Sequence, residues 1–489
     1  MISFVLNNQL TIIEQASADL TLLEYLREQK KLTGSKEGCA SGDCGACTVV
    51  IAEIDNTDKD ALSYKAINSC VTFLSALQGK QLITVEHLAD GKNLHPVQQS
   101  MVDHHASQCG FCTPGFIMSM FALYQQPNEP DHEGVINALS GNLCRCTGYR
   151  PIIDAALSVC QNKVADKFQQ KQLQTIAQLS AIETTGMGTE SLLIPTSRQD
   201  LAAALAANPL AKVFSGSTDL ALQVTQQLKS FERLISLGAV PELNSIIEQE
   251  TGLLIGAALP FAKIEAKLLK HFPDLSELLW RFAATPIRNQ ASLGGNVANA
   301  SPIGDMPPAL LALNAFIHVD NGQTKRLIPA QEFFLDYRKT ALKNDEWVEA
   351  IFIPYAHSTN IVRAYKVSKR YEDDISAVCA VFNIQVENGK IIDLNCGFGG
   401  VAAIPASLPA LKTALLGQTW SSASTFETGK QILSQAFSPI DDVRASKTYR
   451  ISMLVNLWKR FWLETNQQNH GIQTRVVNIP QTTGSMTNA

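Results

Sequence analysis

Hydrophobic residues near the N-terminus follow strand and helix patterns in turn. Residues 2–5 and 10–13 read as strands on either side of Asn7-Asn8, which predicts a β-hairpin. Residues 21–29 carry leucines at helical spacing, with Thr21 as the expected cap. Residues 48–54 read as a further strand. The pattern predicts a small unit of mixed strands and helices.

Prolines mark the next expected helix starts. Thr113 is expected to cap a helix that begins with Pro114, and Pro151 is expected to begin another over residues 151–161. The stretch 106–128 has no charged residue and is long enough to span a bilayer, but its continuous apolar part is only residues 116–124. We therefore expect a buried helix and no membrane span.

A second pattern of alternating strands and helices begins near Leu192. A short strand is expected from Lys212 into a Gly/Ser loop, followed by a helix over residues 220–228. Further on, Asn388-Gly389 between two apolar runs predicts another hairpin. Its strands are expected at 375–386 and 391–398, and helices at 422–437 and 445–465. The polar stretches 161–188 and 466–489 are expected to be a connector, with room for one helix, and a loose tail.

Composition excludes some classes of function. The 489 residues are 45% hydrophobic and 17% charged, which suits three or four folded domains. The 40 Lys and Arg against 45 Asp and Glu give a net charge of −5, so we expect no chain-wide basic surface for nucleic acid. No export signal is apparent at the start, and we expect a cytoplasmic protein.

Eleven cysteines, nine of them before residue 161, carry the strongest chemical signal. An odd count without an export signal favours reduced thiols that act as ligands. Cys39, Cys44 and Cys47 share one Gly-rich segment, and Cys70 follows after 22 residues. This C-x4-C-x2-C…C spacing is that of plant-type ferredoxins, which bind one [2Fe–2S] cluster. The intervening glycines allow positive φ angles and bring backbone N–H groups near the sulfurs.

Zinc is the alternative metal, but zinc sites usually carry short C-x2–4-C pairs in both halves. A second group has Cys109-Gly-Phe-Cys112 and, after 31 residues, Cys144-Arg-Cys146. These cysteines precede expected helix starts, where the helix dipole favours an anionic cluster. The other cysteines lie in apolar surroundings and are expected to be buried free thiols: Cys160, Cys379 and Cys396.

The two groups, with QCGFCTPGF and NLCRCTGYRPI, resemble the iron–sulfur part of the molybdenum hydroxylases. This family includes xanthine dehydrogenase, aldehyde oxidase and bacterial carbon monoxide dehydrogenase. The resemblance implies a [2Fe–2S] cluster on each group, with the helical one nearer to a molybdopterin cofactor and Gln108 at the position of a pterin contact. The expected ligands are a first quartet, Cys39, Cys44, Cys47 and Cys70, and a second quartet, Cys109, Cys112, Cys144 and Cys146.

Two loops in the middle of the chain suit a diphosphate ligand. KVFSGSTD, residues 212–219, joins a strand to a helix, and such junctions offer backbone N–H groups to phosphates. IRNQASLGGNVANASPIGD, residues 287–305, is a second loop dense in Gly, Asn and Ser. A G-x-G-x-x-G series is absent from this sequence pattern, so an ordinary Rossmann fingerprint is not supported. Each loop alone is also compatible with a plain turn.

Together the two loops resemble the FAD domain of the same family, which has a vanillyl-alcohol-oxidase-like fold. Asp219 stands where xanthine dehydrogenases often carry Glu, so the carboxylate has a shorter reach. Residues 364–376, AYKVSKRYEDDIS, read alone as a solvated turn but resemble a charged segment beside the family's flavin that influences whether NAD or dioxygen accepts electrons. The FAD contacts that the resemblance implies are Lys212, Val213, Phe214, Ser215, Gly216, Ser217, Thr218, Asp219, Phe282, Ser292, Asn296, Asp305 and Lys366.

The resemblance implies a multidomain α+β chain. The expected parts are a plant-type β-grasp [2Fe–2S] ferredoxin domain (1–85), a helical [2Fe–2S]-binding domain (86–160), a linker (161–188), an FAD-binding domain (189–365), a C-terminal α+β flavoprotein domain (366–465) and a flexible tail (466–489).

The fused arrangement is most similar to the small subunit of bacterial xanthine dehydrogenase. It implies that electrons from purine hydroxylation, hypoxanthine or xanthine to urate, pass from molybdenum through both clusters to FAD and on to NAD, with no catalytic side chain in this chain. The molybdopterin-binding large subunit is expected as a separate partner in a hetero-oligomer such as a heterotetramer. The alternatives are the same part of an aldehyde or N-heterocycle oxidoreductase, and a redox-sensing protein that binds clusters or flavin without turnover.

Overall fold

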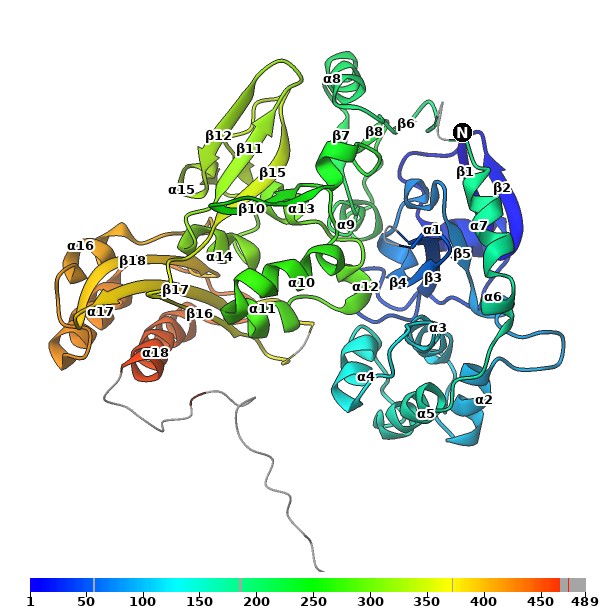
Figure 1. Ribbon diagram of the computed structural model, residues 1–489, viewed down its shortest axis with the longest axis horizontal. Coiled ribbons are helices and arrows are strands. Elements are labelled where there is room, and N and C mark those ends of the chain that lie inside the picture. The colour runs from blue at the N-terminus through cyan, green and yellow to red at the C-terminus, as the bar shows by residue number, and fades with distance from the viewer. Residues whose placement is uncertain (56–57, 184–186, 372, 467–473, 475–489) are drawn as a thin grey trace, which may run out of the picture.

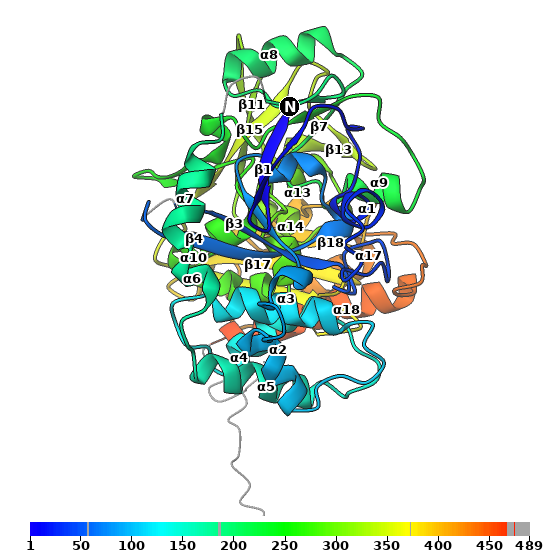
Figure 2. The same cartoon turned by 90° about the vertical axis from the view of Figure 1, so that its right-hand side faces the viewer.

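A computed structural model describes residues 1–55, 58–183, 187–371, 373–466 and 474. The N-terminal sheet and its helices lie at one end of the long axis, and the C-terminal sheet and helices lie at the other (Figure 1). In the turned view the helices α2–α5 lie below the N-terminal sheet, and α8 lies at the opposite end (Figure 2). The multidomain α+β class expected from the sequence is confirmed.

The N-terminal unit is a five-stranded sheet in the order β2-β1-β5-β3-β4. The expected first hairpin is confirmed: β1 and β2 pair antiparallel, and Asn7 turns with a φ of 59°. β1 also pairs with β5, in parallel, so the two ends of the unit meet at its centre. The strands are β1 (Ile2–Leu6), β2 (Gln9–Ile13), β3 (Thr48–Ile54), β4 (Leu62–Asn68) and β5 (Gln81–Ile83).

The helix expected at residues 21–29 forms in two parts. An α-helical turn, α1 (Leu22–Glu24), continues as a π-helical turn, η1 (Tyr25–Gln29). Thr21 is the cap, because its Oγ1 accepts a hydrogen bond from the Glu24 N–H at 3.2 Å. Three short 3-10 turns complete the unit: η2 (Ser69–Val71), η3 (Leu74–Leu77) and η4 (Val85–His87).

Helices follow below this sheet. The apolar helix α3 is buried along almost its whole length, which confirms the expected core helix. The expectation that Thr113 caps this helix is wrong, because Thr113 is the first helical residue and Cys112 is at the N-cap. Thr113 Oγ1 instead hydrogen-bonds Ser107 Oγ at 2.6 Å. Within the described residues, every helix is too short or too polar to cross a membrane. The helices are α2 (Pro96–Asp103), α3 (Thr113–Tyr124), α4 (His132–Leu139) and α5 (Arg150–Gln161).

The connector carries two helices rather than one, α6 (Lys167–Gln170) and α7 (Gln172–Ser180). Leu179 of α7 and Ile182, just after this helix, form a small core with Val5 of the N-terminal sheet. The connector is therefore packed against the first unit (Figure 1). Residues 184–186 lie outside the described residues, as does most of the expected tail.

The middle unit contains a parallel three-stranded sheet, β6-β8-β7, and a five-stranded antiparallel sheet, β12-β11-β15-β10-β9. Helix α9 is shorter than the expected 220–228, because Leu228 has a φ of 55° and turns the chain away. The strands are β6 (Leu192–Leu193), β7 (Lys212–Phe214), β8 (Leu234–Ser236), β9 (Ile246–Glu248), β10 (Gly252–Gly256), β11 (Phe316–Asp320), β12 (Lys325–Pro329) and β15 (Trp347–Pro354), with a hairpin of β13 (Phe334–Asp336) and β14 (Lys339–Thr340). The helices are α8 (Arg198–Ala207), α9 (Ala221–Thr225), α10 (Phe261–His271), α11 (Ser276–Trp280), α12 (Thr285–Arg288), α13 (Leu293–Ala298), α14 (Met306–Ala312) and α15 (Ala330–Phe333), with 3-10 turns η5 (Pro241–Asn244) and η6 (Pro273–Leu275).

The C-terminal unit packs helices on an antiparallel sheet, β16-β17-β18. Asn388 and Gly389 form the expected hairpin turn, with φ of 50° and 76°. The division expected at 365/366 falls inside β16, which pairs with β17 from Asn360 onward, so this sheet begins before residue 366. The elements are β16 (Asn360–Val367), β17 (Val378–Glu387), β18 (Lys390–Gly399), α16 (Pro409–Leu415), α17 (Ala423–Gln435) and α18 (Lys447–Thr465).

A largely buried carboxylate joins the N-terminal sheet to the middle unit. Glu53 on β3 forms an ion pair with Lys65 of β4, and its side chain also lies 3.6 Å from Lys80 and 3.1 Å from Lys263 of α10. Burial alone would raise the pKa of Glu53, but the three ammonium groups outweigh burial and hold that pKa well below its usual range. The carboxylate therefore stabilises the junction in its charged form.

We predict that Glu53→Gln lowers the free energy of unfolding by about 1–3 kcal/mol at pH 7, because Lys65 loses its partner. The ion pair contributes fully above the unfolded pKa of about 4.3 and is lost as pH falls toward the lower folded pKa. Urea titrations should therefore show the gap between wild type and Glu53→Gln closing below about pH 4. Glu28→Gln, at an exposed pair with Lys31, is the control and should match wild type at every pH. A gap that persists at low pH would contradict this account.

Candidate cluster and flavin sites

The first quartet lies at the centre of the N-terminal unit. Residues 39–47, here called the cluster loop, bring three of its thiols together, and Cys70 arrives from η2. Cys47 Sγ and Cys70 Sγ are 3.3 Å apart, and both residues are buried. Cys39 and Cys44 hydrogen-bond each other on the outer side of the loop. Gly42 and Gly45 turn the loop with φ of 80° and 66°, which glycine adopts without strain.

Donors surround the sulfurs of this quartet. The Ser41 N–H donates to Cys39 Sγ at 3.4 Å. The Cys44 thiol, and after it Ser41, lower the pKa of Cys39 to about 4, against the opposing effect of burial. The Cys70 thiol likewise lowers the pKa of the buried Cys47. The donating thiols have their own pKa raised in turn, Cys44 by its bond with Cys39 and Cys70 by its bond with Cys47. The backbone N–H donors, such as that of Ser41, favour thiolate, the form that binds iron.

The second quartet lies between the helices. Cys112 hydrogen-bonds Cys144, and Cys109 hydrogen-bonds Cys146. The Cys146 N–H and the Thr147 hydroxyl both donate to Cys144 Sγ, at 3.4 and 3.2 Å. Cys109 and Cys146 are exposed, in contrast to the buried pair of the first quartet. Gln108, beside Cys109, is exposed on the same surface.

The pairwise arrangement of thiols suits a two-iron cluster. Among the side chains of the described residues, no three of His, Cys, Asp or Glu are placed around one point to hold a single metal ion. In a [2Fe–2S] cluster, two cysteines bind each of two irons. Both quartets divide in this way, and both offer N–H or O–H donors to sulfur. The residues present therefore fit the group that their spacing predicts. The remaining cysteines, Cys160, Cys379 and Cys396, are buried and free, as expected.

The two Gly-rich loops of the middle unit face one cavity of about 590 Å³. The cluster loop forms part of its wall through Ser41, Gly42 and Asp43. Such a volume is in the ordinary range for a cofactor site. All the sequence-predicted flavin residues except Asp305 and Lys366 line it: Lys212, Val213, Phe214, Ser215, Gly216, Ser217, Thr218, Asp219, Phe282, Ser292 and Asn296.

The cavity lining offers hydrogen-bonding groups that suit a ligand with phosphates and hydroxyls. In the described structure, the backbone N–H groups of residues 215–219 donate to no other residue. Consecutive free N–H groups of this kind bind phosphate oxygens. Asn296 Oδ1 is buried and likewise has no partner among the described residues. Burial raises the pKa of Asp219, although Arg338 and Asn299 oppose the effect. These features fit a dinucleotide such as FAD.

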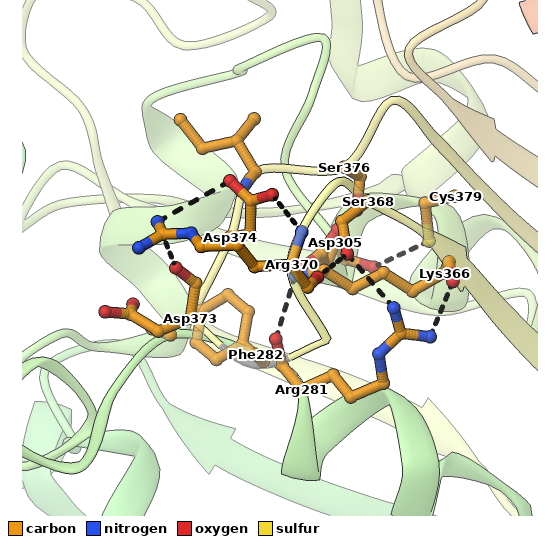
Figure 3. Close-up of polar contacts among 12 residues, drawn as sticks. Arg281, Phe282, Asp305, Lys366, Ser368, Arg370, Asp373, Asp374, Ser376 and Cys379 are labelled. Carbon is orange, nitrogen blue, oxygen red and sulfur yellow. Dashed lines mark hydrogen bonds and ion pairs between the residues drawn. The ribbon is translucent and has the colours of Figure 1, made fainter. Parts of the chain in front are cut away.

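Asp305 and Lys366, which do not line the cavity, form a buried ion pair (Figure 3). Lys366 Nζ lies 2.6 Å from Asp305 Oδ2 and donates to the carbonyl of Arg281 at 2.9 Å. The Ser376 hydroxyl donates to the other carboxylate oxygen at 2.5 Å. Because Arg281 precedes Phe282, the pair supports the backbone of a cavity residue. The assignment of Asp305 and Lys366 as flavin contacts stays a prediction.

Arg281 also holds the charged segment. Its guanidinium donates to the carbonyls of Tyr371 at 2.9 Å and Lys366 at 2.6 Å, and to Ser368 Oγ at 3.0 Å (Figure 3). It lies 4.6 Å from the centre of the Tyr371 ring, a cation–π contact. Nearby, burial and then the charge of Asp43 raise the pKa of Asp373 to about 6. The segment is therefore anchored, and one of its carboxyls is electrostatically coupled to the cluster loop.

Sequence reasoning missed several residues of this site. Asp43 and Arg338 also line the cavity, one from the cluster loop and one from the turn between β13 and β14. Arg281, next to the predicted Phe282, was not singled out although it contacts three residues of the charged segment. No spacing rule marks such residues, because tertiary packing brings them to the site.

Comparison with known families agrees with this layout. Four family models match consecutive parts of the chain. They are the 2Fe-2S iron-sulfur cluster binding domain (5–75), the [2Fe-2S] binding domain (84–157), the FAD binding domain in molybdopterin dehydrogenase (185–356) and the CO dehydrogenase flavoprotein C-terminal domain (363–465).

Curated relatives extend over nearly the whole chain. Xanthine dehydrogenase 1 of Arabidopsis thaliana is 32% identical over 95% of this chain, and the xanthine dehydrogenase of Emericella nidulans is 32% identical over 96%. The chain belongs to the molybdenum hydroxylase family, as its iron–sulfur and flavin portion. It spans 40% and 39% of the length of these two relatives.

Solved structures share the fold of just over half of this chain. A chain of carbon monoxide dehydrogenase from Hydrogenophaga pseudoflava superposes with a TM-score of 0.53 at 22% identity, covering 55% of this chain and 94% of its own. A chain of quinoline 2-oxidoreductase from Pseudomonas putida 86 gives 0.52 at 23%, covering 57% and 97%. The family models give the chain two [2Fe–2S] domains and an FAD domain.

We predict that Cys47→Ser removes the first cluster and keeps the second, so that iron content falls to about half. Iron and sulfide analysis with electron paramagnetic resonance should then show a single cluster signal. Cys160→Ser changes a buried cysteine outside both quartets and should retain both signals. Two intact signals in Cys47→Ser would show that Cys47 is not a ligand.

We predict that Gly216→Ala weakens FAD binding by about tenfold or more, because overpacking costs about 1–3 kcal/mol. A Cβ at Gly216 would lie 1.9 Å from the Gln290 carbonyl and would push the loop into the cavity. Gly238→Ala adds the same methyl group where the nearest atom is 3.7 Å away, and it should bind FAD normally. Flavin fluorescence titration of both variants measures the difference, and equal affinities would refute the role of the loop.

Proposed function

We propose that this chain is the electron-transfer subunit of a xanthine dehydrogenase. Electrons from purine hydroxylation at a molybdopterin site on a partner chain would pass through the helical cluster and the plant-type cluster to FAD, with NAD as the final acceptor. The relatives named xanthine dehydrogenases, which align with almost the whole chain, favour this substrate class. We propose the site residues and domain divisions expected from the sequence as the working assignment, with the division at 365/366 moved to the start of β16 at Asn360.

The single observation that carries the proposal is the shared wall between the two sites. Ser41, Gly42 and Asp43 of the cluster loop line the same cavity as the flavin loop at Ser215–Ser217. When bound, [2Fe–2S] clusters exchange single electrons, whereas FAD stores two electrons and exchanges hydride with a nicotinamide. A wall of three small loop residues keeps the two sites adjacent.

The residues of this chain hold and orient the groups. The two cysteine quartets supply the thiolates. The free N–H groups of residues 215–219 are proposed to bind the diphosphate, and Asp219 to accept from a sugar hydroxyl. Lys366 and Asp305 fix the backbone at Phe282, and Arg281 anchors the charged segment. Each of these roles is positional, so no side chain here is required as a general acid or base.

We predict that NADH bleaches the visible absorbance of the anaerobically purified chain, because hydride enters at FAD and electrons then distribute over the clusters. Analysis for iron, sulfide, zinc and flavin accompanies the measurement. The chain co-purified with its partner should in addition be bleached by xanthine, whereas the chain alone should not. Zinc in place of iron and sulfide would overturn the cluster assignment. Bound FAD that exchanges no electrons with NADH would favour a sensor, and bleaching of the complex by an aldehyde alone would change the substrate class.

A further inference from the structure

One side chain of the middle unit reaches the cluster loop next to Cys39. Gln226 Nε2 donates hydrogen bonds to the carbonyls of Cys39 at 3.0 Å and Ala40 at 2.9 Å. Ala40 has a φ of 52°, in the left-handed region that is unfavourable for alanine. One amide group therefore holds two consecutive carbonyls at a strained turn of the loop.

The peptide group of Ala40 continues this contact to the sulfur. The Ala40 carbonyl and the Ser41 N–H belong to the same peptide group, and this N–H donates to Cys39 Sγ at 3.4 Å. A hydrogen bond accepted by a peptide oxygen polarises the group and strengthens the donor at its other end. Gln226 thus acts on Cys39 Sγ through one peptide group, without touching the sulfur.

We propose that Gln226 is a positioning residue that raises the reduction potential of the plant-type cluster. The proposal rests on the proposed function, because it needs Cys39 as a cluster ligand. Reduction adds negative charge, and hydrogen bonds donated toward the sulfurs stabilise the more negative state. Without Gln226, the Ala40–Ser41 peptide is less polarised and less firmly held. The reduced cluster is then less stabilised relative to the oxidised cluster, and the reduction potential falls.

The position of Gln226 links the two sites of the chain. It is the C-cap residue of α9, the short helix that follows the flavin loop. Gln223, one turn earlier on the same helix, lines the flavin cavity, as does Ser41 of the cluster loop. The flavin domain therefore contributes a donor to the environment of the neighbouring cluster.

The test is a potentiometric titration of the full chain under anaerobic conditions, followed by electron paramagnetic resonance. Gln226→Ala should move the midpoint of the plant-type signal to a more negative potential. Gln226→Glu should move it further, because a carboxylate lacks the N–H groups and adds a negative charge. In both variants the midpoint of the second cluster should stay at its wild-type value. Gln227→Ala, at the next exposed position, is the matched control and should titrate as wild type.

Each outcome decides a separate question. A wild-type chain without a plant-type signal would defeat the proposed function itself. A wild-type signal whose midpoint is unchanged in both Gln226 variants would overturn the inference about Gln226 alone. If Gln226→Ala fails to retain the cluster, the shorter amide of Gln226→Asn replaces it. A more negative midpoint in that variant supports the inference, and a wild-type midpoint rejects it.

Discussion

The cluster loop takes its shape from contacts with neighbouring units. Asn142, between α4 and α5, donates through Nδ2 to the carbonyl of Gly45 at 3.0 Å, and the Leu143 N–H donates to the Cys44 carbonyl at 2.9 Å. The backbones meet so closely that a Cβ at Gly45 would lie 2.2 Å from the Gly141 carbonyl. Residues of the middle unit hold the other side. The helical unit and the middle unit therefore both contribute contacts that hold the loop in its conformation.

The same packing closes the interface beside the flavin cavity. Thr72 Oγ1 donates to the Gln290 side chain at 2.7 Å, and the Ser217 hydroxyl donates to the Val71 carbonyl at 2.9 Å. Val71 and Thr72 follow the cluster cysteine Cys70, whereas Ser217 and Gln290 belong to the two Gly-rich loops of the flavin cavity. The two hydrogen bonds therefore couple the geometry of the cluster site to that of the flavin cavity. Asp43 extends the coupling to electrostatics, because its charge acts on Asp373 of the charged segment. The geometry and the electrostatics of the cluster site and the flavin cavity therefore both depend on the interface between the N-terminal unit and the middle unit.

Much of this arrangement could be predicted from the sequence because its signals are local. The cysteine spacing, the Asn388-Gly389 hairpin and the apolar run of α3 each act over a few residues, and the fold class followed from their order. Tertiary effects account for the differences. The Thr113 hydroxyl hydrogen-bonds Ser107 and does not cap α3, and Cys112 is the N-cap residue.

Other features depend on residues far apart in the chain. The cavity wall formed by Asp43 and Arg338 and the support given by Arg281 join residues from different units, and no periodicity in a single sequence reports such contacts. The cysteine ligands and flavin contacts remain predictions, since the structure brings the residues together without the groups that they would hold. Asp305 and Lys366 of the predicted flavin set form an ion pair that contacts the Arg281 carbonyl, next to the cavity residue Phe282.

The unequal exposure of the two quartets has a consequence for durability. Cys47 and Cys70 are shielded inside the N-terminal unit, whereas Cys109 and Cys146 lie at the surface. Thiolates at the surface are the first that oxidants and chelators meet. In the chain on its own, oxidative damage would therefore begin at the outer cluster, before it reaches the inner one.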